Sequence, residues 1–257
     1  MLKHLHSFQD LFADERYILL KNHLYNYLVR KRAIKRALRD VQTRYVLEIG
    51  SGLSPIAEKG PGATIVYSDL SFEALRILKR NRVEGLPVAA DGMELPFRDG
   101  TFGVAVCSEV LEHIDDDRRA IREMARVVQP GGVVIVTFPH RHFYFAWDDR
   151  FVHHFRRYEV EEMLQWLREA GLEPFNVEKV LGPLEKITTI LVLFVYTALG
   201  WLWGGNRTER KLGSLPRWTT LCFKGANRLY AGLAAFDARL WPLCLATVVL
   251  VKAEKRR

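Results

Sequence analysis

From residue 45 onward, short apolar runs alternate with stretches of helical spacing, and this alternation limits the possible folds more than any other feature. The stretch 118–128 has helical spacing and is followed by a helix stop at Pro130, Gly131 and Gly132, and a further helix ends at Gly171. Such a chain is expected to form a largely parallel sheet with helices on both faces. The predicted strands are 45–50, 64–70, 86–90, 102–108, 132–138, 173–180 and 243–253.

Residues 14–40 have the apolar spacing of a helix, and this predicted helix has a basic end. Either these basic residues form a solvated face, or they bind the phosphate groups of lipid head groups or RNA. We predict that residues 1–44 form a basic helical cap. The basic residues are Arg30, Lys31, Arg32, Lys35, Arg36 and Arg39.

The stretch 183–242 does not follow the strand–helix rhythm, and we predict that it is a helical insertion in a domain made of residues 45–182 and 243–257. It contains 17 uncharged residues, Ile187 to Trp203. It continues with a basic linker and an amphipathic repeat. The linker carries Arg207, Arg210, Lys211 and Arg217, and the repeat comprises Trp218, Cys222, Ala226, Leu229, Leu233, Phe236 and Leu240.

An apolar run of this length lies at the lower limit for a membrane span, and a single span would separate the last strand from its sheet. Lys224, Arg228, Asp237 and Arg239 would also be costly in hydrocarbon. The sequence therefore favours peripheral contact of residues 187–240 with one leaflet, with Trp201 and Trp203 at the interface. The alternative is a buried lid or a dimer interface, and the oligomeric state stays open.

The overall charge indicates anionic partners without selecting one. The formal net charge is +8, which suits a nucleic acid, a phospholipid surface or an acidic substrate. Cys107, Cys222 and Cys244 are odd in number and lack metal-site spacing, so we expect free thiols. The start of the sequence has no signal-peptide pattern, and we expect a cytoplasmic protein, peripheral at the cytoplasmic face of the membrane.

The run VLEIGSGLSP (46–55) joins the first predicted strand to a predicted helix through two glycines. Gly50 permits a tight turn and Gly52 permits close approach of a ligand, while Ser54 and Pro55 suit a helix start. A glycine turn alone is compatible with NAD, FAD or simple packing.

Acidic residues at the ends of the first three strands make the glycine turn more specific. Glu48 precedes Gly50, Asp69 ends the second strand, and Asp91 follows the third. A carboxylate at the position of Asp69 can accept both ribose hydroxyls of an adenosine. Asp91 can accept the adenine amino group, with the backbone of Gly92 and Met93 at the ring edge.

The successive motifs EIGSG, SDLS, ADGMELPFRDGTFGVAVCSEVLEHI and QPGGVVIVTFP resemble those of class I S-adenosylmethionine-dependent methyltransferases of type 11. This resemblance covers residues 45 to about 180 and the last strand. It implies an α/β Rossmann-like three-layer sandwich with a seven-stranded, mostly parallel sheet whose last strand is antiparallel. The sequence departs from the family pattern at Leu53-Ser54-Pro55. The cofactor-binding residues that the resemblance implies are Glu48, Gly50, Ser51, Gly52, Asp69, Leu70, Asp91, Gly92, Met93 and Ser108.

Acids and histidines cluster after the fourth and fifth predicted strands, where ligands bind in such sheets. His113, Glu109 and His154 are the candidate catalytic residues, with His113 as the first candidate for a general base. The resemblance also implies a metal set of Glu109, Glu112, His113 and His153, because a similar arrangement occurs in ubiquinone-type and small-RNA methyltransferases. The alternative is that these residues only contact the cofactor and cap a helix, so a divalent metal is not the first expectation.

We therefore predict a methyltransferase that uses S-adenosyl-L-methionine and methylates an oxygen, nitrogen or carbon atom of a small-molecule or lipid acceptor. A membrane-associated quinone precursor, polyprenyl-linked sugar or lipid head group fits the insertion. One alternative is an RNA 2′-O-methyltransferase, which is less favoured because the basic residues lack interleaved aromatics. Another is a catalytically silent, cofactor-binding partner subunit.

Overall fold

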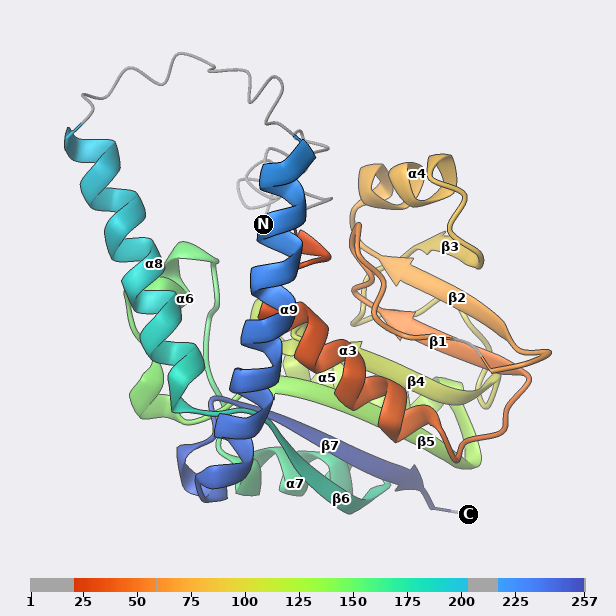
Figure 1. Cartoon of the computed structure of the whole chain (residues 1–257). Coiled ribbons are helices and arrows are strands. Elements are labelled where there is room, and N and C mark those ends of the chain that lie inside the picture. Colours follow the sequence, from red (N-terminus) through yellow and green to blue (C-terminus); the bar gives the residue numbers. More distant parts are fainter. Residues whose placement is uncertain (1–20, 59, 203–216, 257) are drawn as a thin grey trace.

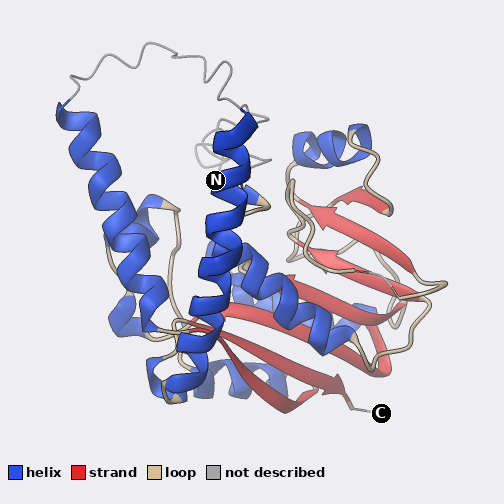
Figure 2. Cartoon of the chain, viewed as in Figure 1, coloured by secondary structure: helices blue, strands red, loops and turns tan. Residues whose placement is uncertain are grey.

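The computed structural model of the chain describes residues 21–58, 60–202 and 217–256. In this part, seven strands form one sheet in the order β3-β2-β1-β4-β5-β7-β6 (Figures 1 and 2). The strands are β1 (Tyr45–Ile49), β2 (Thr64–Asp69), β3 (Leu86–Ala89), β4 (Phe102–Ser108), β5 (Val128–Pro139), β6 (Leu172–Leu181) and β7 (Val248–Lys255). The four pairings among β1 to β5 are parallel, whereas β7 runs antiparallel to both neighbours. The predicted Rossmann-like fold is confirmed, including its antiparallel last strand.

Helices cover both faces of the sheet, as predicted. One face packs against α5 (Asp117–Val127) and α7 (Val160–Glu169), and the other against α3 (Tyr25–Leu38), α4 (Phe72–Arg80) and α9 (Arg217–Leu240). Successive residues of β1 point to opposite faces of the sheet. Leu47 packs in the core with α5 and α7, and Val46 packs in the core with α3, α4 and α9. This alternation follows from the period of two along a strand.

Two predicted strand boundaries are wrong, and the start of the N-terminal helix is not tested. The fifth strand begins at Val128, so Pro130 lies inside β5 and does not precede it. Its proline is tolerated because parallel pairing with β4 is interrupted between Phe102 and Val104. The last strand begins at Val248, after a short 3₁₀ turn. The N-terminal helix is described as α3 from Tyr25, and residues 1–20 lie outside the described part.

The helix expected after Gly52 is absent from the described residues between β1 and β2. Both carboxylate oxygens of Glu48 accept backbone N–H groups in this segment, from Ile56 at 2.8 Å and Ala57 at 2.9 Å. These bonds satisfy donors that the first turn of a helix would leave unpaired. Ser54 accordingly caps no helix, and its buried hydroxyl has no partner within the described chain.

The predicted insertion contains α8 (Pro183–Leu202) and α9, which extend beyond the sheet as a two-helix arm (Figure 1). In the part of the chain that the structure describes, neither of these helices nor any other is long and apolar enough to cross a membrane. Trp203 and the linker residues Arg207, Arg210 and Lys211 lie outside the described residues, and the side chain of Trp201 is not described either.

The amphipathic repeat of α9 does not face the protein body. Small side chains form the buried face of α9, at Ala231, Ala234 and Ala238. Alanines allow the helix to approach its neighbours closely, and this leaves the larger apolar side chains on the outside. Leu229, Leu233, Phe236 and Leu240 are exposed on α9, as are Ile187, Ile190, Leu191, Val192 and Phe194 on α8.

Candidate functional site

The carboxyl ends of β1, β2 and β4 are adjacent, and the turn after β1 lies among them. Gly50 has φ +68° and its N–H donates to the Ser68 carbonyl at 2.8 Å. A Cβ at Gly50 would lie only 2.3 Å from Val110, so this position requires glycine. Gly52 also has positive φ, at +52°, but a Cβ added there would have no neighbouring atom within 4 Å. The space beside Gly50 is therefore filled by the Val110 side chain, whereas the space beside Gly52 is open for a ligand.

Asp69 lies beside that open glycine, at the end of β2. Its carboxylate accepts the N–H of Gly52 at 2.7 Å and the N–H of Ser71 at 2.8 Å. Burial raises the pKa of Asp69, while these two bonds and the charge of Lys21 oppose the rise. A carboxylate has about four lone-pair sites, so two stay free to accept ribose hydroxyls. Leu70 is exposed next to it.

The turn after β3 forms a second binding element. The Asp91 carboxylate accepts the Met93 N–H at 2.8 Å, which fixes a tight turn. Gly92 packs within that turn against Ile114 and Ile49, where a Cβ would come within 3.3 and 3.5 Å of their side chains. Asp91, Gly92 and Met93 are all partly exposed, so this turn presents both backbone and carboxylate to a ligand.

Two buried serine hydroxyls near the glycine turn have no hydrogen-bond partner within the described residues, at Ser51 and Ser68. Buried polar groups are normally paired, so orphaned hydroxyls indicate a place for a polar ligand. Together with the open Gly52, they fit the binding of S-adenosylmethionine. Glu48 differs from the expectation, because both its oxygens already bind the backbone of the 56–57 segment and it does not present a free carboxylate.

Beyond β4, polar side chains link the ends of two strands. The Ser108 and Thr137 hydroxyls lie 2.8 Å apart, and Thr137 donates to Glu109 at 3.3 Å. Glu109 has φ +55°, a conformation that is uncommon for a residue other than glycine. This backbone turn directs the chain away from the sheet into the 3₁₀ turn Leu111–His113.

That turn places Glu112 and His113 against His154 from the loop after β5. The two imidazole rings meet edge to face with centroids 4.8 Å apart, and His154 Nε2 lies 3.7 Å from a Glu112 carboxylate oxygen. Burial and the charge of Glu109 raise the pKa of Glu112 well above its ordinary value. Burial and neighbouring His154 lower the pKa of His113 to about 4. The two Glu112 oxygens have no hydrogen-bond partner in the described chain.

A buried group of charged residues lies directly behind His154. Asp149 accepts from His154 Nδ1 at 3.0 Å and from Arg157 Nε at 2.8 Å. Lys186, from the start of α8, donates to Asp149 at 2.9 Å and to Asp148 at 2.7 and 2.8 Å. His154 donates through Nδ1 to this anion, which leaves its Nε2 as the acceptor. We call Asp148, Asp149, Arg157 and Lys186 the ion cluster.

The structure brings together a different potential metal set from the one predicted. One donor atom each from Glu112, His113 and His154 lie within 4.8 Å of one another. Glu109 is outside this group, and His153 contacts it only through its backbone carbonyl, 3.3 Å from His113 Nδ1. The backbone of His153 is left-handed, with φ +62°. Because of this turn, the side chain of His154 reaches the group and that of His153 does not.

Sequence reasoning assigned no role to the residues that orient His154. Asp149 had a local signal, because it lies five residues before His154 in a histidine-rich loop. Lys186 had none, because it is 37 residues from Asp149 and belongs to the insertion. Thr137, which contacts Ser108 and Glu109, had no signal in the sequence either, because it lies in a strand of mostly apolar residues.

Comparisons with known proteins agree with this geometry. Residues 47–136 match the family described as a methyltransferase domain. A demethylmenaquinone methyltransferase of Streptomyces avermitilis is 35% identical over 146 residues, which are 54% of this chain and 63% of that protein. A similarly named protein of Corynebacterium kroppenstedtii is 42% identical over 91 residues, 35% of this chain and 38% of that protein. The chain thus spans less than two thirds of the length of these curated relatives.

A solved structure shares the whole fold. An S-adenosylmethionine-dependent methyltransferase from Thermotoga maritima is 19% identical, with a TM-score of 0.61 over 98% of this chain and 99% of that one. At 19% identity, this similarity shows only that the two proteins share a fold. The domain match and the fold thus agree: residues 47–136 match a methyltransferase domain, and the whole chain has the fold of an S-adenosylmethionine-dependent methyltransferase.

Proposed function

We propose that this protein transfers a methyl group from S-adenosylmethionine to an oxygen, nitrogen or carbon atom of a membrane-associated amphiphilic acceptor. The observation that carries the proposal is His154, oriented by buried Asp149 beside the carboxyl end of β4. The relatives named demethylmenaquinone methyltransferases support an acceptor of the quinone class. A lipid head group or a polyprenyl-linked sugar is chemically similar in combining a polar reacting end with hydrocarbon.

The residues divide between cofactor binding and proton transfer. S-adenosylmethionine, when bound, supplies an electrophilic methyl group on its sulfonium, so the protein mainly aligns the acceptor and removes a proton where the acceptor requires it. Asp69 would hold the ribose, and the Asp91 turn would hold the adenine. Gly50 and Gly52 would admit the methionine part.

We assign the general base to His154 in preference to His113. A ring whose pKa is about 4 is a weak base at neutral pH, which argues against His113. His154 donates from Nδ1 to Asp149, so its Nε2 can accept a proton from the acceptor. Asp149 acts as a positioning residue, since its carboxylate fixes the ring and stabilises the imidazolium that forms.

The arm supports peripheral contact with a membrane at its cytoplasmic face. Large apolar side chains are exposed along α8 and α9, and others are exposed on the loop that carries His154. Large exposed apolar side chains gathered on two helices are typical of an interaction site. The exposed loop residues are Phe143, Trp147, Phe151, Val152 and Phe155.

The test uses S-adenosylmethionine with a radiolabelled methyl group, incubated with a total lipid extract and, separately, with total RNA. Label in the organic phase supports the proposal, and label only in RNA replaces it with the RNA alternative. Tight cofactor binding without label in either fraction points to a soluble acceptor or a silent subunit. The His154→Gln variant should lose about 10²- to 10⁴-fold in turnover while its cofactor affinity stays unchanged.

The group formed by Glu112, His113 and His154 also has the nitrogen and oxygen donors that a divalent cation accepts. Assay in EDTA separates the two roles of His154. Full activity in EDTA supports the assignment of His154 as a general base. Loss of activity that Mg²⁺ or Zn²⁺ restores would replace the base with a metal centre.

A further inference from the structure

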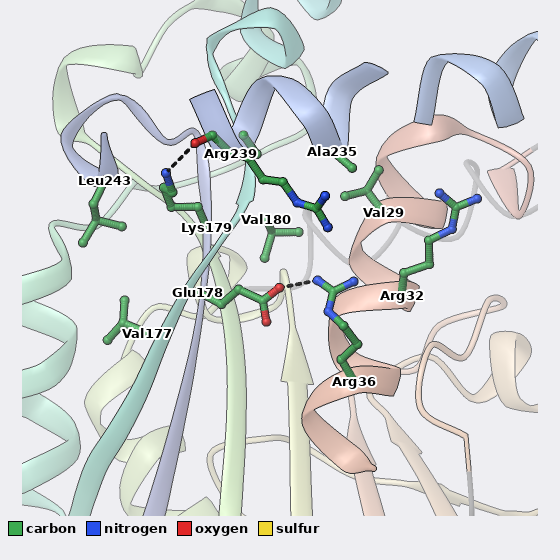
Figure 3. A pocket seen from close by; sticks show the side chains of 11 residues that line it. Val29, Arg32, Arg36, Val177, Glu178, Lys179, Val180, Ala235, Arg239 and Leu243 are labelled. Carbon is green, nitrogen blue, oxygen red and sulfur yellow. Dashed lines mark hydrogen bonds and ion pairs between the residues drawn. The ribbon is translucent and has the colours of Figure 1, made fainter. Parts of the chain in front are cut away.

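A cavity of about 440 Å³ lies between α3, β6 and the end of α9, and the methyl-transfer proposal does not use it (Figure 3). Its lining comes from Val29, Arg32 and Arg36 of α3, from β6 residues 177–180, and from α9 together with Leu243. None of the lining residues belongs to the glycine turn, the Asp91 turn or the His154 loop. The cavity is therefore a separate feature of the surface.

Positive charge converges on this cavity from three elements. Arg32 and Arg36 come from α3, Lys179 from β6 and Arg239 from α9, and Glu178 is the one acid among the described lining residues. Four cations and one anion give the lining a net charge of +3. Because the cations come from segments far apart in sequence, folding alone brings them together.

The pairing of these charges leaves two guanidinium groups available. Arg36 forms an ion pair with Glu178, and Lys179 donates to the backbone carbonyls of Arg239 in α9, at 3.5 Å, and of Trp241 just after it. Within the described residues, the side chains of Arg32 and Arg239 have no hydrogen-bond or ion-pair partner. Figure 3 shows both beside the cavity. Two guanidinium groups without protein partners in the described part of the chain can bind a phosphate group through paired N–H donors.

The basic stripe that the sequence analysis singled out on α3 is thus divided between two roles. Lys31 and Lys35 are engaged by Glu58, at 3.2 and 2.7 Å. Arg32 and Arg36 instead line the cavity, and Figure 3 shows Arg36 pointing toward Glu178. A uniformly solvated face would not separate the residues in this way.

The other walls of the cavity are apolar and determine which phosphate compound fits. The apolar lining residues are Val29, Val177, Val180, Ala235, Ala238 and Leu243. The described lining includes no aromatic side chain on which a nucleic-acid base could stack. An anionic head group with hydrocarbon attached meets both kinds of surface, whereas a free phosphate uses only the arginines.

We propose that this cavity binds the phosphate group of an anionic membrane lipid, with Arg32 and Arg239 as the principal ligands. This site gives the protein a preference for anionic bilayers, beyond the apolar contact that the arm supplies. The proposal does not depend on methyl transfer, because it concerns binding of the whole chain to lipid.

The experiment compares two double variants with the same loss of charge. Arg32→Gln with Arg239→Gln removes the free guanidinium groups of the cavity. Arg39→Gln with Arg122→Gln removes two exposed arginines outside it. Each protein is floated with vesicles of phosphatidylcholine alone and of phosphatidylcholine with phosphatidylglycerol. Cofactor affinity, measured by calorimetry, verifies that each variant is folded.

The cavity variant should lose about 30-fold in partitioning to the anionic vesicles, about fivefold for each arginine, and the control variant much less. Binding to phosphatidylcholine vesicles should not change. Equal losses in both double variants would overturn the proposal, because they would show a diffuse charge effect. Displacement of wild-type protein from anionic vesicles by glycerol phosphate at matched concentration would identify a free phosphate ester as the ligand. Loss of RNA binding in the cavity variant, without loss of vesicle binding, would identify RNA.

Discussion

Lys186 connects the helical arm to the candidate catalytic residues, and its replacement by methionine tests whether the ion cluster holds them together. Its ammonium lies 2.7 and 2.8 Å from the two oxygens of Asp148 and 2.9 Å from Asp149. The side chains of Lys186 and Asp148 are only 6% and 7% exposed. Water therefore cannot substitute for the missing partner when the charge is removed.

The magnitude follows from the charge balance of the ion cluster. Asp148 and Asp149 are balanced by Lys186 and Arg157, so Lys186→Met leaves one buried carboxylate uncompensated. Removing one partner of a buried pair costs about 3–5 kcal/mol in the free energy of unfolding. Adding Asp148→Asn restores the balance, because Asp149 keeps Arg157. The double variant should regain most of that loss.

Urea unfolding at pH 7 measures both free energies, and single-turnover methyl transfer measures the effect on His154. We expect Lys186→Met to be the less stable protein and to be slower, since Asp149 loses one of the donors that fix it. A loss below about 1 kcal/mol for Lys186→Met, or a double variant no more stable than the single one, would refute the balanced-cluster reasoning.

Three further predictions concern the cofactor site. Asp69→Ala should weaken S-adenosylmethionine binding at least about tenfold by calorimetry, because the carboxylate that accepts the ribose hydroxyls is lost; unchanged affinity would remove the ribose assignment. Gly50→Ala should lower the melting temperature more than Gly62→Ala, since both have positive φ but only Gly50 would place a Cβ against Val110, at 2.3 Å. Burial raises the pKa of Glu48 from 4.5 to about 8, so the folded state keeps a proton that the unfolded state releases. Unfolding free energy should therefore fall by up to about 1.4 kcal/mol per pH unit between pH 4.5 and 8, and Glu48→Gln should flatten that slope.

The sheet could be predicted because its signals are local. Most strands contain a short apolar run with valine or isoleucine, and each of the first three ends at or just before a glycine or an acid that the turn requires. Gly50 and Asp69 were therefore identified from neighbours in sequence. The same locality explains the errors at Pro130 and Ser54. Pro130 has the sequence signal of a helix stop, yet irregular pairing with β4 lets it lie in a strand.

Contacts between distant segments could not be predicted. Nothing near Glu48 indicates that its carboxylate binds Ile56 and Ala57 and replaces the first turn of a helix. The spacing of α9 correctly indicated an amphipathic helix, but spacing alone does not say which face packs. Here the alanine face packs on the body, because small side chains permit close approach, and the leucine face is left exposed.

The arrangement of the arm gives a physical reason for a buried ion cluster at its base. The alanine face of α9 packs on the protein body, whereas the large apolar side chains described on α8 are exposed, so polar contacts at the start of α8 contribute to its orientation. Asp237 accepts the Leu184 N–H at 3.1 Å and joins α9 to the start of α8. Lys186 then joins α8 to Asp149 and, through it, to His154. Buried charge pairs are sensitive to geometry, so tilting α8 would disturb the hydrogen bond that orients the proposed base. If the arm contacts a bilayer as proposed, that contact would in this way act on the proposed general base.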